Sequence, residues 1–132
     1  MTAKERASAI HADGFNCAQS VFAGCAQCAG IDENTAKAIS VGFGGGMRCG
    51  EVCGAISGAV MAIGAAFSGD DASSPEAKAN GRKYCIAFMT AVREKYGAVT
   101  CRELKSPEHL VPCDKLISEC AELAENIINN NK

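Results

Sequence analysis

The sequence predicts an all-α fold, a small helical bundle that forms one domain over residues 1–132. No segment keeps the apolar–polar alternation of a half-buried strand, whereas helix caps recur along the chain. Small residues are unusually frequent, with 23 Ala and 14 Gly in 132 residues, while aromatics make up 5% and Trp is absent. We therefore expect a core of closely approaching helices around a Gly/Ala-rich central helix.

Three helices are expected in the N-terminal third, because each has recognisable start or stop signals. Asn16 and Gln19 match a capping box, and Asp32 is an N-cap candidate. Gly14 and Gly30 end the first two helices. The predicted helices cover residues 2–13, 17–29 and 33–41.

The central helix is expected to follow the Gly44–Gly46 turn and to run from about Cys49 to Phe67. A small-residue row at Gly50, Gly54 and Gly58, continued by Ala62, would let a neighbouring backbone approach it closely. Further caps then predict a helix over residues 75–96, a first turn at residue 101 and a last helix after residue 112.

Composition excludes several functional classes. With 21% charged residues and a net charge of −2, the chain is not disordered by composition. It also offers no basic surface for nucleic acid or anionic lipid. The longest apolar run, 55–67, is shorter than the roughly 20 residues that cross a bilayer, and no signal peptide is visible. A cytoplasmic location follows as an expectation, and thiols there serve metal, cluster or redox chemistry more often than structural disulfides.

Nine cysteines are the outstanding feature, and their odd number excludes a complete disulfide framework within the chain. Cys25 and Cys28 form a CxxC that approaches zinc-ribbon spacing when combined with Cys49 and Cys53. Both pairs lie in helical patterns rather than glycine-rich knuckles, which favours small core residues or surface thiols for Cys25 and Cys28.

Helix periodicity separates the remaining cysteines. Cys49 and Cys53, four residues apart, are expected on one side of the central helix, near its start. Cys85 and Cys120 fall on apolar stripes, where a free cysteine packs as a small hydrophobe. The two histidines, His11 and His109, are expected at the surface.

Four thiols share a position at predicted helix N-termini, where the helix dipole favours a thiolate. Metals, iron–sulfur clusters and disulfide exchange all use the thiolate form. These thiols are Cys17, Cys53, Cys101 and Cys113. We expect them to converge in space at one pole of the bundle.

The same residues carry a resemblance to a family. The segments that carry it are Gly14-Phe15-Asn16-Cys17, Phe43-Gly44-Gly45-Gly46-Met47, Gly50-Glu51-Val52-Cys53-Gly54-Ala55-Ile56-Ser57-Gly58, Cys101-Arg102-Glu103-Leu104 and Cys113. They resemble the C_GCAxxG_C_C proteins, which are described as redox-active, from Gly14 to about Cys120.

The resemblance implies a redox role for Cys17, Cys53, Cys101 and Cys113 as redox-active thiols and as ligands, with Cys49 as a substitute ligand. The function that we expect first is binding of an iron–sulfur cluster by these thiols, for electron transfer or redox sensing. A cofactor-free thiol/disulfide protein and a zinc or other metal-binding domain stay open as alternatives. An oxidoreductase and an electron-transfer accessory protein both fit the resemblance. The sequence does not identify the redox partner, and it is compatible with a homodimer.

Overall fold

A computed structural model describes residues 1–132 and confirms the all-α prediction. It contains eight α-helices and two short helical turns, and its only β-type pairing is an isolated bridge between Val52 and Thr100. The elements are α1 (Ala3–Ala12), α2 (Cys17–Gly24), α3 (Ala26–Ala29), α4 (Glu33–Ser40), η1 (Val41–Phe43), η2 (Gly46–Gly50), α5 (Gly54–Ser68), α6 (Pro75–Tyr96), α7 (Cys101–Leu104) and α8 (Cys113–Asn131).

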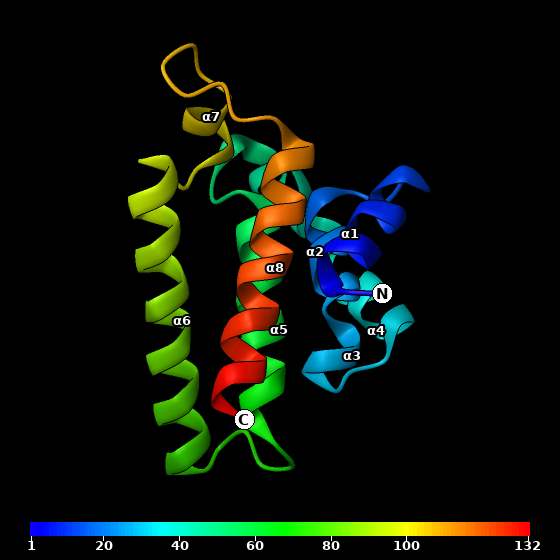
Figure 1. Ribbon diagram of the computed structural model, residues 1–132, viewed down its shortest axis with the longest axis vertical. Coiled ribbons are helices and arrows are strands. Elements are labelled where there is room, and N and C mark those ends of the chain that lie inside the picture. Colours follow the sequence, from blue (N-terminus) through cyan, green and yellow to red (C-terminus); the bar gives the residue numbers. More distant parts are fainter.

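Helix α5 is the centre of the bundle. It contacts α2, α6 and α8, and in Figure 1 α6 and α8 run alongside it while α1 to α4 lie on its other side. The short helix α7 lies near the end of the molecule where α6 ends and α8 begins. The first turns of several helices are therefore gathered at one pole. None of the helices combines the length and the apolar character that crossing a membrane requires.

Small residues allow the helices to approach closely, as the composition predicts. A Cβ added at Gly58 of α5 would lie 2.7 Å from the Ala18 carbonyl oxygen of α2. A Cβ at Gly24 of α2 would lie 2.7 Å from the Ala7 Cβ of α1. Both gaps are too short for a side chain, so glycine sets the spacing of α1, α2 and α5. Alanines from all three helices belong to one buried core, namely Ala3, Ala7, Ala23, Ala55, Ala59, Ala62 and Ala66.

The central helix begins later than the sequence predicts, at Gly54 rather than about Cys49. The segment before it cannot be helical, because Gly45, Gly46, Met47, Arg48 and Gly50 all have positive φ. Instead it folds into the tight turn η2, closed by a hydrogen bond from the Glu51 N–H to the Gly46 carbonyl. Gly50 therefore lies outside the small-residue row of α5.

The predicted helix over residues 17–29 is also interrupted. Helix α2 ends at Gly24, and Cys25, with φ −93° and ψ 2°, joins it to the single turn of α3. The break directs the chain from α2 toward α4, and it gives Cys25 a position between two helices rather than inside one.

The first testable prediction concerns the contact at Gly58. Replacing Gly58 by Ala should lower the free energy of unfolding by about 1–3 kcal/mol, because the new methyl group overpacks the α2–α5 contact. Gly64 is the matched control in the same helix, since a Cβ there meets nothing within 4 Å. Gly64→Ala should be neutral or stabilising by up to about 1 kcal/mol, in line with helix propensity. Urea unfolding measures both, and equal stabilities for the two variants would contradict the close approach.

The second prediction concerns the Asn16 cap. The Asn16 side chain accepts from the Gln19 N–H at 3.0 Å and also donates to the Val41 carbonyl at 3.0 Å. Asp32 caps α4 through Thr35 but is exposed and makes no such bond to another element. Asn16→Ala should cost about 1 kcal/mol for the cap and about 1 more for the second hydrogen bond. Thermal or urea unfolding should therefore show a larger loss for Asn16→Ala than for Asp32→Ala.

Candidate functional site

Four cysteines begin four different helices, as the sequence predicts. Cys17, Cys101 and Cys113 are the first residues of α2, α7 and α8, and Cys53 immediately precedes α5. Asn16 and Thr100 cap the helices of Cys17 and Cys101 through their side chains. The local sequence thus fixes each of these thiols at the start of a helix.

The structure brings these four thiols together around one cavity of about 70 Å³. Cys17, Cys53, Cys101 and Cys113 all line it, although up to 96 residues separate them in the sequence. Cys53 is buried and the other three are half-buried. The remaining lining residues are Gly45, Leu104, Lys105 and Leu116. We call this cavity and its lining the four-cysteine pocket.

Backbone pairing holds two of the four cysteines next to each other. The Cys53 N–H donates to the Val99 carbonyl at 2.9 Å, and the Cys101 N–H donates to the Glu51 carbonyl at 2.7 Å. The Val52–Thr100 bridge lies between these two hydrogen bonds. The extended segment that replaces the predicted start of the central helix therefore places Cys53 beside Cys101.

Gly54 makes room for the sulfur of Cys17. A Cβ added at Gly54 would lie only 2.4 Å from Cys17 Sγ and 3.1 Å from the Ala18 nitrogen. Because no side chain occupies this space, the start of α2 rests directly against the start of α5. The glycine that follows Cys53 is thus a packing requirement of the pocket.

The thiol of Cys53 is held in its neutral form. Burial raises the pKa of Cys53 to about 11, while hydrogen bonds from the backbone N–H groups of Ala55 and Ile56 oppose the rise. Negative charge on Cys17 or Cys101 raises the same pKa further. These thiols are therefore close enough to influence one another's ionisation.

Lys105 is a charged residue of this pocket that sequence reasoning missed. Its Nζ lies within hydrogen-bond distance of Cys113 Sγ. That contact raises the pKa of Lys105, with smaller contributions from charge on Cys113, Cys101 and Cys53, while burial opposes the rise. Its position four residues after Cys101, one helical turn along, is the signal that could have indicated it.

The side chains of the pocket are not arranged around a common point as metal ligands would be. No group of three or more Cys, His, Asp and Glu side chains is arranged to hold a metal ion anywhere in the chain. All nine cysteines are free, so no disulfide is present either. The four sulfurs share a cavity without being bonded to one another.

Cys49, expected beside Cys53 and as a substitute ligand, is separated from the pocket. It lies in η2, is exposed, and does not line the cavity. Its carbonyl accepts a hydrogen bond from Arg102 at 3.1 Å. The expectation that Cys49 and Cys53 share one helix is wrong, because the left-handed residues of η2 intervene.

The other expected core thiols differ from each other. Cys120 is buried, as predicted, whereas Cys85 is only half-buried. Burial raises the pKa of both thiols, and charge on Cys53 adds to the rise at Cys120. Neither residue lines the four-cysteine pocket. Both histidines also lie outside it, with His11 paired to Asp114 at 3.0 Å and His109 beside Ser106 at 3.3 Å.

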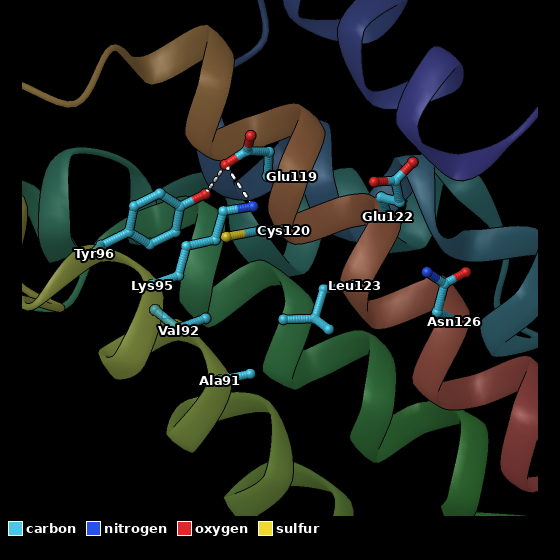
Figure 2. A pocket seen from close by; sticks show the side chains of 9 residues that line it. All are labelled: Ala91, Val92, Lys95, Tyr96, Glu119, Cys120, Glu122, Leu123 and Asn126. Carbon is cyan, nitrogen blue, oxygen red and sulfur yellow. Dashed lines mark hydrogen bonds and ion pairs between the residues drawn. The ribbon is translucent and has the colours of Figure 1, made fainter.

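A second cavity, of about 200 Å³, lies between α6 and α8 (Figure 2). Glu119 accepts a hydrogen bond from the Tyr96 hydroxyl and pairs with Lys95 at 3.1 Å. Burial raises the pKa of Glu119, but the bonds from Tyr96 and Lys95 outweigh it and leave that pKa lowered. Tyr96, Lys95 and Glu119 are thus already paired with one another, and the one thiol in this cavity is that of Cys120, which is buried.

The comparisons with known proteins agree with the cysteine pattern. Residues 15–127 match the family described as "Putative redox-active protein (C_GCAxxG_C_C)". No curated protein and no solved structure matches the chain. Because the family match covers most of the 132 residues, the chain belongs to the C_GCAxxG_C_C family of redox-active proteins.

Proposed function

We propose that the four-cysteine pocket is the redox centre of this protein and that its thiolates hold an iron–sulfur cluster for electron transfer or redox sensing. The observation that carries the proposal is the convergence of four thiols from four helix starts on one small cavity. Repulsion among four thiolates makes such convergence unfavourable unless a cofactor or oxidation compensates it.

The chemistry of the donor set fits the cluster. Iron–sulfur clusters are held by cysteine thiolates, commonly four of them. Each sulfur here is one rotatable bond from a backbone that its helix start fixes, so rotation about χ1 can turn it toward the cavity. Cys17, Cys53, Cys101 and Cys113 would be the ligands.

The neighbouring residues have roles that suit such a centre. A bound cluster supplies one-electron transfer. Leu104 and Leu116 are buried and exclude water from the cavity, and the ammonium group of Lys105 offsets part of the negative charge on the sulfurs. Electrons would be exchanged with a redox partner protein, and we propose a cytoplasmic setting for this exchange.

Cofactor analysis of anaerobically purified protein tests the proposal. Iron and acid-labile sulfide should be bound, with visible absorption, and serine variants of Cys17, Cys53, Cys101 or Cys113 should each lose most of the iron. Cys85→Ser is the matched control, because Cys85 is half-buried like three of the ligands but lies outside the pocket. Cys120→Ala should also retain the iron.

Three outcomes would contradict the cluster. Iron that is retained in all four serine variants would place the cofactor elsewhere. Bound zinc without sulfide would identify the alternative metal-binding domain. A metal-free protein whose pocket thiols pair reversibly would support thiol chemistry instead.

Thiol/disulfide exchange is the second candidate, and the contact between Lys105 and Cys113 favours it. An ammonium group next to a sulfur stabilises the reactive thiolate. Cys113 would attack a disulfide of a partner, forming a mixed disulfide and releasing one partner thiol. A second pocket thiol would then attack Cys113 Sγ and release the other. Two electrons pass to the partner, and each departing thiolate takes the proton that an attacking thiol has lost.

A lysine substitution tests this reactivity. In reduced, metal-free protein, Lys105→Met should slow alkylation of Cys113 by iodoacetamide severalfold, because the neighbouring positive charge is lost. Lys115→Met removes the same charge from the first turns of α8 without a contact to sulfur and should leave the rate unchanged. Equal rates in the two variants would remove the support for an activated Cys113.

A further inference from the structure

The remaining CxxC, Cys25 and Cys28, lies outside the four-cysteine pocket. Cys25 joins α2 to α3, and Cys28 is the third residue of α3. Neither lines the cavity of Cys17, Cys53, Cys101 and Cys113. In Figure 1 the α2–α3 junction also lies well away from α7, where that pocket is found.

The two residues of this CxxC are in contact with each other. The Cys28 thiol donates to the Cys25 carbonyl oxygen at 3.2 Å, which folds its side chain back onto Cys25. Residues three apart in a helix have Cβ atoms about 5–6 Å apart, and a disulfide needs about 3.5–4.5 Å. Because Cys25 lies at a helix break and α3 is a single turn, a small local adjustment closes this gap.

The surroundings give the two thiols different roles. Cys28 is half-buried and reachable from solvent, whereas Cys25 is fully buried and its Sγ donates toward the Ala121 carbonyl of α8 at 3.7 Å. The neighbouring Cys25 side chain lowers the pKa of Cys28, whereas the pKa of Cys25 is raised by the Cys28 side chain and by burial. Nearby Arg6 lowers both, and Glu125, which lies 3.8 Å from Arg6, opposes it.

We infer that Cys25 and Cys28 form a second redox couple, a reversible intramolecular disulfide that reacts with low-molecular-weight disulfides independently of the four-cysteine pocket. The accessible Cys28 thiolate attacks the external disulfide, forms a mixed disulfide and releases one thiol. The buried Cys25 then attacks Cys28 Sγ, gives its proton to the departing thiolate and releases the second thiol. Two electrons pass from the dithiol to the external disulfide, which is reduced to two thiols.

Oxidation would also change a contact with α8. The disulfide uses the Cys25 sulfur and removes its S–H donor, so the hydrogen bond to the Ala121 carbonyl is lost. Helix α8 begins with Cys113, a thiol of the four-cysteine pocket. The Cys25–Ala121 hydrogen bond therefore links the CxxC to a helix that also carries a residue of that pocket.

Mass spectrometry of the full-length protein tests the inference. The protein is incubated with oxidised glutathione, alkylated and digested with trypsin. Cys17 shares the tryptic peptide of residues 7–37 with the pair, so fragmentation must assign the linkage. We expect a Cys25–Cys28 disulfide that protects both residues from alkylation and that a reductant reopens.

Two variants separate the roles. Cys25→Ala should accumulate glutathione on Cys28, because no second thiol resolves the mixed disulfide. Cys28→Ser should leave the buried Cys25 unmodified under the same conditions. Cys85→Ser is the control and should form the disulfide as the unaltered protein does.

Several results would overturn the inference. These are unchanged alkylation of Cys25 and Cys28 after oxidation, a linkage of either one to Cys17, or ready modification of Cys25 in Cys28→Ser. The unaltered protein decides the first two without relying on the folding of a variant. Iron and sulfide analysis reports on the other site alone, so loss of cofactor in Cys17→Ser, for example, leaves this test unaffected.

Discussion

The contact between α2 and α5 determines most of what is described above. Gly54 and Gly58 present no side chain to α2, so the Cys17 sulfur and the Ala18 carbonyl lie directly against α5. With the starts of these two helices fixed side by side, the turn η2 and the extended segment after it must pass over the same pole. That passage brings Cys53 next to Cys101. A core of large aromatic side chains would hold the helices further apart, and the four sulfurs could not share so small a cavity.

The sequence predicted the helical class and the positions of the four signature thiols because both depend on local signals. Caps such as Asn16 and Thr100 act within a few residues. The helices therefore begin at Cys17 and Cys101, as the capping pattern in the sequence predicts. The error at Cys49 has a non-local cause. The four-residue spacing of Cys49 and Cys53 after the glycine turn is compatible with a helix, but Glu51 and Val52 instead pair with residues near Thr100 about 50 positions later. The periodicity of one segment cannot reveal a pairing partner that lies so far away in the chain.

The surroundings of Lys105 and of the CxxC could not be predicted from local sequence either. Lys105 is an ordinary exposed lysine in the sequence, and only the arrival of α8 brings Cys113 to it. Cys25 and Cys28 follow a helical pattern, and the break between α2 and α3 falls at Cys25, directly after Gly24, where the sequence pattern predicts a continuous helix. The surroundings of both thiols depend on how separate helices pack, as in the approach of α8 to Lys105 and of the Ala121 carbonyl to Cys25, and the local sequence pattern does not contain this information.

The distribution of the pocket over four helix starts has a consequence for the folding equilibrium. Any bond that links these sulfurs, through a cofactor or as disulfides, cross-links segments that lie far apart in the chain, such as Cys17 and Cys101, which are 84 positions apart. A covalent link that closes a loop of about 100 residues lowers the entropy of the unfolded chain by an amount worth roughly 4–5 kcal/mol. That is comparable to the whole stability of a small domain. If the pocket is the redox centre proposed above, its oxidation state and the unfolding temperature of the protein are thermodynamically coupled, and thermal stability reports the redox state.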